Sequence, residues 1–195
     1  PKTVALIGAS ENAQKLTARP MSFMKMHGFI GDIFPVNPNH AVIDGVKAYK
    51  TLKDIPVRID YAYIMVGTSH VISALEDCAR AKVKVVSILA DGFAEKGEEG
   101  KQLQAKVVQI AKHAGILLIG PNSMGIVDTR SRFCCTTNAA FRSEQLKAGR
   151  YAVISQSGSL IGTLLSRGSE RGINFSTFVS VGNEACIGVG GIGSL

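Results

Sequence analysis

The chain has 195 residues, which is enough for one large domain or for one complete domain and part of another. A hydrophobic content of 46% indicates a globular protein with a core, and no apolar run approaches the roughly 20 residues that span a bilayer. The net charge of +7 favours anionic partners, whereas an aromatic content of 6% without a basic stripe argues against nucleic acid.

Cysteine usage and the first residues indicate a cytoplasmic protein without membrane attachment. The chain enters a strand directly, without the charged and apolar regions of a signal peptide. The four cysteines are Cys78, Cys134, Cys135 and Cys186. They lack the spacing of a metal site, and the adjacent pair is poorly placed to bridge itself. We expect reduced structural thiols and no metal.

Apolar runs of strand length alternate with helical patterns from Val4 to Ile119. The runs are continuous, which is typical of parallel strands covered on both faces. The expected strands are Val4–Ile7, Ile33–Val36, Tyr61–Val66, Val83–Leu89 and Ile116–Ile119. The expected helices are Pro20–Met26, Ser69–Ala81 and Glu98–His113, with Ser69 as an N-cap and Gly28 and Gly115 as C-terminal stops. This order predicts a Rossmann-like, doubly wound parallel α/β sheet.

The pattern changes at residue 128. Residues 128–148 show little periodicity and are expected to connect a first domain, residues 1–127, to a second. A strand from Tyr151, a helix to about Arg171 and a strand at Phe175–Val181 then form one βαβ unit. Two parallel strands do not bury both faces alone, and the Gly-rich tail adds no core. Residues 149–195 are therefore interpreted as the beginning of a truncated second domain.

The first strand ends in a turn of small residues, Gly8, Ala9 and Ser10, which lets backbone N–H groups approach an anion. The turn lacks the GxGxxG of a dinucleotide fold. Because ligands bind at the carboxyl ends of parallel strands, we expect a nucleotide or cofactor phosphate here. Lys15 and Arg19 are placed to supply charge to a diphosphate, although exposed, solvated side chains explain them equally well.

The other strand ends carry small and polar residues that share one edge of a doubly wound sheet. They are Val36, Asn37 and Pro38, then Gly67 and Thr68, then Ala90, Asp91 and Gly92, and finally Asn122. A dinucleotide fold usually carries an acidic residue for the ribose after its second strand. Asn37 stands there instead, which suits a ligand whose ribose carries a phosphate.

A second strand-to-helix turn, Ser155-Gln156-Ser157-Gly158-Ser159, follows the strand at Tyr151. Small residues at a helix N-terminus allow several N–H groups to converge on one anion. The turn is not the GxSxG elbow of a hydrolase, and no histidine lies in a pattern typical of a triad. We interpret it as an anion-binding loop and assign no catalytic residue.

Taken in order, these segments resemble the CoA-binding part of the NDP-forming acyl-CoA synthetases. That superfamily includes the ADP-forming acetate–CoA ligases and the alpha subunit of succinyl-CoA synthetase. The resemblance runs from Val4 to about Ala185 and rests on VALIGAS, GDIFPVNPN, GVKAYKTLKDIP, ILADGFAEKGEEG, IGPNSMGIVDT, ISQSGSL and FVSVGNEA. It implies a Rossmann-like CoA-binding domain followed by the start of a flavodoxin-like domain.

The resemblance also implies roles for the strand ends. Gly8, Ala9 and Ser10 contact the CoA diphosphate, with Lys15 beside them, and Val36, Asn37 and Pro38 line the adenosine. Gly67, Thr68, Ala90, Asp91 and Gly92 flank the nucleotide and pantetheine, and Asn122 lies by the thiol. Ser155, Gln156, Ser157, Gly158 and Ser159 hold a phosphate that the family carries on a histidine, formed from an acyl phosphate.

The same resemblance implies an acid–thiol ligase that joins a small carboxylic acid to CoA at the expense of a nucleoside triphosphate. The phosphorylated histidine is expected outside this chain. So is the ATP-grasp domain or subunit that binds ATP or ADP and Mg, within an oligomer. We therefore expect the chain to bind CoA without completing the reaction.

One departure and two alternatives stay open. The family usually has Cys where this chain has Ser123, which we expect to alter packing at the thiol end. One alternative is a non-catalytic CoA-binding regulatory module, for example fused to an acetyltransferase. The other is an NAD(P)-dependent oxidoreductase, against which the missing GxGxxG and ribose carboxylate count. We expect Gly8→Val to exclude the diphosphate, and Gly158→Val to abolish phosphate binding while sparing CoA.

Overall fold

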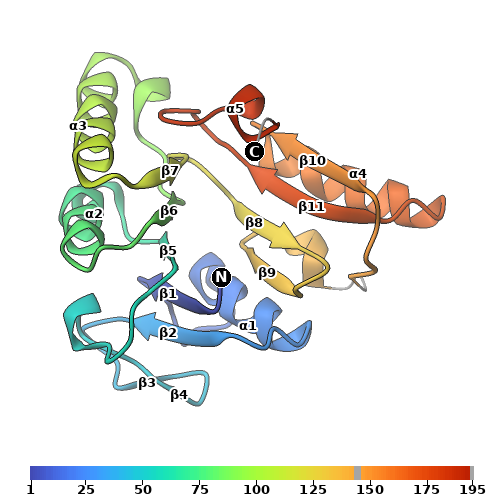
Figure 1. The fold of residues 1–195 in the computed structure, drawn as a ribbon, viewed down its shortest axis with the longest axis horizontal. Coiled ribbons are helices and arrows are strands. Elements are labelled where there is room, and N and C mark those ends of the chain that lie inside the picture. The colour runs from blue at the N-terminus through green and yellow to red at the C-terminus, as the bar shows by residue number, and fades with distance from the viewer. Residues whose placement is uncertain (143–145, 194–195) are drawn as a thin grey trace.

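The computed structural model describes residues 1–142 and 146–193, which form a five-stranded and a four-stranded sheet and a small hairpin (Figure 1). The five-stranded sheet has the order β2-β1-β5-β6-β7, and all of its pairs are parallel. Its strands are β1 (Thr3–Ile7), β2 (Asp32–Val36), β5 (Tyr61–Ile64), β6 (Val85–Ile88) and β7 (Leu117–Ile119). The strand order reverses between β1 and β5, so the expected doubly wound sheet is confirmed and its switch point lies there.

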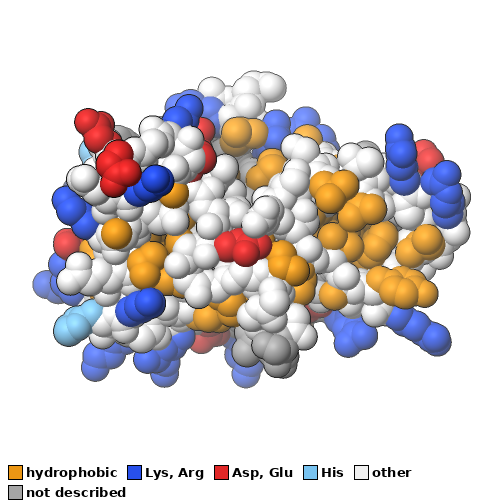
Figure 2. Space-filling view, turned by 90° about the horizontal axis from the view of Figure 1, so that it is seen from above, with side chains coloured by type: hydrophobic (Ala, Val, Ile, Leu, Met, Phe, Trp, Pro, Cys, Tyr) orange, Lys and Arg blue, Asp and Glu red, His pale blue; other side chains and the backbone are white. Residues whose placement is uncertain are grey.

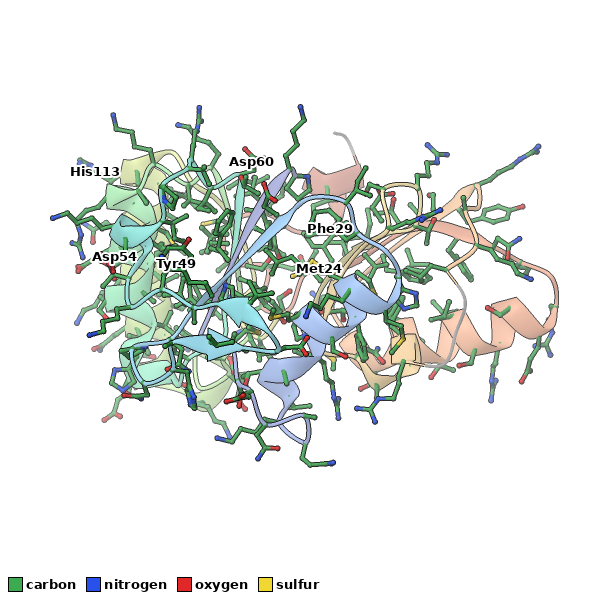
Figure 3. The ribbon with its side chains drawn as sticks, turned by 90° about the horizontal axis from the view of Figure 1, so that it is seen from below. Met24, Phe29, Tyr49, Asp54, Asp60 and His113 are labelled. Atoms are coloured by element: carbon green, nitrogen blue, oxygen red, sulfur yellow. The ribbon has the colours of Figure 1, made fainter. Side chains whose placement is uncertain are left out.

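Helices cover both faces of this sheet, as its continuous apolar strands require. On one face, α2 (Val71–Arg80) and α3 (Glu98–Ala114) form a core with inward side chains from all five strands. On the other face, α1 (Arg19–Met26) contributes Met21 and Met24 to a second core. Figure 3 labels Met24 and Phe29 beside α1, on the far side of the sheet from Tyr49 and His113. The hairpin of β3 (Val42–Ile43) and β4 (Val46–Lys47) flanks β2.

The second sheet has the order β10-β11-β8-β9 and is mixed. Its strands are β8 (Gly125–Asp128), β9 (Phe133–Thr136), β10 (Tyr151–Ser155) and β11 (Phe175–Ser180). The pair β10 and β11 is parallel, whereas β11, β8 and β9 pair antiparallel. Helix α4 (Gly158–Glu170) packs on this sheet through Ile161 and Leu165.

The βαβ unit of the second part is therefore not alone, which corrects the expectation from sequence. Strand β8 and the hairpin strand β9 extend it, and β9 lies inside the segment expected to be a connection without regular structure. The sequence did not predict β9 because Phe133–Thr136 is only four residues long and all four are buried, so no alternation of polar and apolar residues marks it.

Of two helix ends expected from the sequence, the start at Ser69 is wrong and the end at Gly115 is confirmed. Ser69 is not an N-cap, because a 3₁₀ turn at Thr68–His70 precedes α2 and no side chain caps that helix. Gly115 ends α3 with a left-handed φ of 63°, as expected. The Gly-rich tail forms the short helix α5 (Val189–Gly193), and Ile187 and Ile192 pack against Val179 and Val181, although no core was expected there.

Apolar side chains gather on the outer surface over β10 and α4 (Figure 2). The exposed large apolar residues of this region are Tyr151, Leu160, Leu164 and Ile173. None of the helices within residues 1–142 and 146–193 combines the length and apolar character needed to cross a membrane.

Candidate functional site

The carboxyl ends of β1 and β2 are joined by two hydrogen bonds that fix the first small-residue turn. The N–H of Gly8 donates to the carbonyl of Val36 at 2.9 Å, and the Asn37 side chain donates to the carbonyl of Ala9 at 2.9 Å. The hydroxyl of Ser10 accepts from the backbone N–H of Asn12 at 3.2 Å. Asn37 therefore orders the turn itself, a role that the sequence did not predict for it.

Gly8 is required by its backbone and by its neighbours. Its φ is 86°, a left-handed value that costs other residues about 1–2 kcal/mol. A Cβ at this position would lie 2.9 Å from Val66 Cγ1 and 3.1 Å from the backbone of Met65. The substitution Gly8→Val would therefore disturb the sheet, and it is not a selective test of ligand binding as the sequence had suggested.

The remaining strand ends meet at the same edge. The hydroxyl of Thr68, after β5, donates to the carbonyl of Asp91, after β6, at 2.8 Å. The N–H of Asn122, after β7, donates to the carbonyl of Ala90 at 2.9 Å. A Cβ at the exposed Gly67 would meet no atom within 4 Å, so the space in front of this strand end is open. Of the other expected site residues, Pro38 and Lys15 are exposed on the loops after β2 and β1.

The N–H of Gly92 is occupied by a side chain that the sequence did not single out. Glu95 Oε1 accepts from the N–H groups of Gly92 and Phe93 at 2.6 and 3.1 Å, and Asn183 donates to Oε2. Burial raises the pKa of the Glu95 carboxyl, but these hydrogen bonds outweigh it, so the pKa lies below its ordinary value. A carboxylate thus closes this strand end and ties it to the segment after β11.

The loop Gly120–Met124 joins the two sheets. The buried hydroxyl of Ser123 donates to the carbonyl of Ser180 on β11 at 2.5 Å and accepts from the N–H of Gly125 at 3.2 Å. The hydroxyl of Tyr63 on β5 donates to the carbonyl of Ser123 at 2.8 Å. Asn122 has a left-handed φ of 59° and an exposed side chain. The loop therefore presents Asn122 to solvent while Ser123 anchors it.

The second turn begins α4, but its serines are partly used within the turn. The hydroxyl of Ser155 accepts from the N–H of Ser157 at 3.1 Å, and the hydroxyl of Ser157 caps the helix by accepting from Leu160 N–H at 3.3 Å. Among the described residues the side chains of Gln156 and Ser159 make no hydrogen bond, although the carbonyl of Ser159 accepts from the hydroxyl of Thr163 at 3.4 Å. Fewer N–H groups are free for an anion than the sequence suggested.

The second turn adjoins the loop that carries Asn122. A Cβ on Gly158 would lie 2.2 Å from Met124 Sδ, and the side chain of Asn138 donates to the Gly158 carbonyl at 2.7 Å. The second turn is therefore held against the loop that carries Asn122. The contact also means that Gly158→Val would displace Met124, so this substitution does not separate phosphate binding from CoA binding as expected.

The cysteines have the properties of structural thiols. Cys78, Cys134 and Cys135 are buried and Cys186 is partly buried, and all four are free. Burial raises the pKa of Cys78 to about 12 and raises those of Cys134 and Cys135 further. Within residues 1–142 and 146–193, no three His, Cys, Asp or Glu side chains gather as a metal site.

Two family models match the chain in succession, although their boundary does not follow the two sheets, because β8 of the second sheet lies within the first match. Residues 2–129 match the family described as CoA binding domain, and residues 148–192 match the family described as succinyl-CoA ligase like flavodoxin domain. The second match confirms that the mixed sheet belongs to a flavodoxin-like fold. Both matches agree with the resemblance seen in the sequence.

Curated relatives are ADP-forming ligases of CoA. The 4-hydroxybutyrate–CoA ligase of Nitrosopumilus maritimus is 37% identical over 95% of this chain and 26% of its own length. The alpha subunit of acetate–CoA ligase II of Pyrococcus furiosus is 40% identical over 95% of this chain and 39% of its own length. The chain therefore spans well under half of the length of these relatives.

A solved structure shows the same architecture. The apo form of the acetyl-coenzyme A synthetase 1 of Candidatus Korarchaeum cryptofilum, described as dinucleotide forming, is 31% identical. It superposes with a TM-score of 0.89, over 96% of this chain and 40% of its own. The arrangement of the two sheets is thus one that a solved protein of this kind adopts.

Proposed function

The chain belongs to the CoA binding domain family, and on that premise we propose that it is the CoA-binding part of an ADP-forming acyl-CoA synthetase. The whole protein would join a carboxylic acid to CoA through an acyl phosphate and a phosphohistidine. The observation that carries the proposal is the Gly120–Met124 loop, because it holds the open edge of the parallel sheet and the second turn side by side. Transfer of an acyl group from phosphate to a thiol needs both sites in reach of each other.

In this proposal the strand ends bind CoA and the second turn binds phosphate. The turn Gly8–Ser10 receives the diphosphate, and the N-terminus of α4 offers N–H groups and a favourable dipole to a phosphoryl group. Residues 155–159 act as a binding loop, and no catalytic residue is assigned to the chain. The histidine, the ATP-grasp component and the Mg that it needs are assigned to other parts of the whole protein. A cytoplasmic location and an oligomer complete the proposal, and the free cysteines support the former.

The test is calorimetric titration of the chain with CoA and, separately, with NADH and NADPH. We expect binding of CoA alone. Binding of a nicotinamide cofactor alone would overturn the proposal in favour of an oxidoreductase. A regulatory CoA-binding module remains the second candidate. The two are separated by whether the whole protein becomes labelled on histidine when it is given a nucleoside triphosphate labelled on its γ-phosphate.

A matched pair of glycine variants locates the site. Gly67→Val adds a side chain where no atom lies within 4 Å, so it fills the ligand edge without straining the sheet. Gly190→Val, on α5, also meets no atom within 4 Å and serves as the control. We expect Gly67→Val to weaken CoA binding at least about tenfold, which corresponds to about 1.4 kcal/mol, with unchanged thermal stability. Equal CoA affinity in the two variants would show that CoA binds elsewhere.

A further inference from the structure

The segment after β11, residues 181–185, follows a strand of the second sheet but lies on the ligand edge of the first. Figure 1 shows the chain running back from β11 toward the loop between β6 and α3. The N–H of Asn183 donates to the carbonyl of Pro121 at 2.9 Å, and the N–H of Ala185 donates to that of Gly120 at 3.2 Å. The segment is therefore paired with the loop that follows β7.

The two backbones approach so closely that no side chain fits between them. Gly182 has a left-handed φ of 55°, and a Cβ there would lie 2.1 Å from the carbonyl oxygen of Pro121 and 2.6 Å from that of Asn122. The N–H of Asn122 in turn donates to the carbonyl of Ala90 at 2.9 Å. The loop that presents Asn122 is thus bonded both to the loop after β6 and to the segment after β11.

The side chains of Glu95 and Asn183 close this arrangement into a circuit. Asn183 Nδ2 donates to Glu95 Oε2 at 2.5 Å and to Gln104 Oε1 on α3 at 3.1 Å. The other carboxylate oxygen, Glu95 Oε1, accepts from the N–H groups of Gly92 and Phe93 at 2.6 and 3.1 Å. The bond between Glu95 and Asn183 therefore links the loop after β6 to the segment after β11, and the loop after β7 is bonded to both.

This bond has a fixed direction, because an amide nitrogen donates and an ionised carboxylate only accepts. Replacing Asn183 by Asp would set two carboxylates against each other. Replacing Glu95 by Gln would set one amide NH₂ group against another, provided that the new oxygen keeps the two backbone N–H groups. Making both replacements restores one donor and one acceptor with the direction reversed. The pair can therefore be tested by exchange of its two partners.

We propose that Glu95 and Asn183 are positioning residues of the CoA site, and that their bond holds the Asn122 loop in place for the pantetheine arm and thiol of CoA. The inference rests on the proposed function, which brings the pantetheine to Ala90–Gly92 and the thiol to Asn122. Neither residue contacts the reacting atoms, and both act through the loops that they join. Among the described residues, the turn Gly8–Ser10 shares no hydrogen bond with this circuit, so the nucleotide half of CoA is held independently.

The experiment titrates the chain and its variants calorimetrically with CoA and with adenosine 3′,5′-bisphosphate, the nucleotide half of CoA without its pantetheine arm. We expect Glu95→Ala and Asn183→Asp each to weaken CoA binding about tenfold, as for a lost hydrogen bond to a charged group. Both should change the affinity for the bisphosphate less than about twofold. The control Glu76→Gln removes the same charge from an exposed position on α2 and should change neither affinity.

The exchanged pair supplies a rescue that a general loss of stability would not give. Glu95→Gln alone should weaken CoA binding as Asn183→Asp does, whereas the double variant should return to within about threefold of the unmodified chain. A second measurement needs no variant and keeps the test decisive if one does not fold. The side-chain NH₂ resonances of Asn183 should shift when CoA is added to the unmodified chain and stay in place when the bisphosphate is added.

Four results would overturn the inference alone. They are unchanged CoA affinity in Glu95→Ala, an equal loss of CoA and bisphosphate binding, a folded double variant that binds CoA no better than the single variants, and equal shifts of the Asn183 resonances with both ligands. The second of these would make the pair a support of the whole fold. Failure of the unmodified chain to bind CoA would instead refute the proposed function, and the inference with it.

Discussion

Replacing Ser123 by alanine removes one of two hydroxyls that join the loop after β7 to β11, the other being that of Ser180, which accepts from the N–H of Met124 at 3.0 Å. The Ser123 hydroxyl donates to the Ser180 carbonyl at 2.5 Å and accepts from Gly125 N–H at 3.2 Å, at a position with no solvent exposure. A buried polar group left without its partner costs about 1–3 kcal/mol, so we expect a loss of about 2 kcal/mol. For a chain of this size that lowers the Tm by about 4–8 °C.

The measurement is urea unfolding together with differential scanning calorimetry. The control is Ser69→Ala, at an exposed serine whose change should stay within about 0.5 kcal/mol. Ser123→Cys restores the residue that the resembled family usually has. Because a thiol is a weak donor, we expect it to recover about half of the loss. If Ser123→Ala unfolds at the same urea concentration as the unmodified chain, the hydroxyl does not connect the sheets.

Three further predictions concern thiols, pH and the second turn. At pH about 8 a thiol reagent should modify Cys186 first and the buried Cys78, Cys134 and Cys135 only in urea, since burial raises their pKa values; fast labelling of all four would contradict this. A hydrogen bond from the backbone N–H of Lys2 is the main cause that holds the pKa of Asp60 (labelled in Figure 3) below its ordinary value. The ionised Asp60 carboxylate therefore stabilises the fold above pH about 3.9, and this stabilisation is lost as the pH falls through the lowered pKa. Asp60→Asn should therefore lower the urea midpoint at neutral pH and no longer do so at pH about 2; an equal effect at both would refute the argument. Ser157→Ala should destabilise α4 by about 1 kcal/mol through loss of its N-cap, and an unchanged unfolding midpoint would contradict the capping role.

The parallel sheet could be predicted from sequence because the composition of each strand reflects its burial on both faces. Runs such as Val4–Ile7 and Tyr61–Ile64 are apolar throughout and lie on buried strands, and Gly115 marks the end of α3 by its conformation. The gathering of the strand ends at one edge then followed from chain topology. Local pattern and global fold agree in this part of the chain, which is where prediction from sequence succeeds.

Features that depend on distant partners could not be predicted in the same way. The hydrogen bond from Arg19 to Thr137 joins residues 118 positions apart, and no local spacing signals it. Glu95 and Asn183 are likewise 88 positions apart. Gly8 and Gly158 were recognised as small residues for ligand approach, whereas in the structure their missing side chains also make room for Val66 and Met124. Small size was detectable, but the neighbour that requires it was not.

Successive side chains of strand β9 point into two different cores, and this arrangement affects how the chain unfolds. Phe133 and Cys135 point into the core beneath α1, and Cys134 points into the core beneath α4. One short strand thus contributes buried side chains to both cores, a shared wall between them. Unfolding of either core would therefore expose part of the other. Regions that share buried surface in this way lose structure together. Heating should therefore give one cooperative transition, and hinge motion between the two sheets about the β8–β9 hairpin would have to break that shared wall.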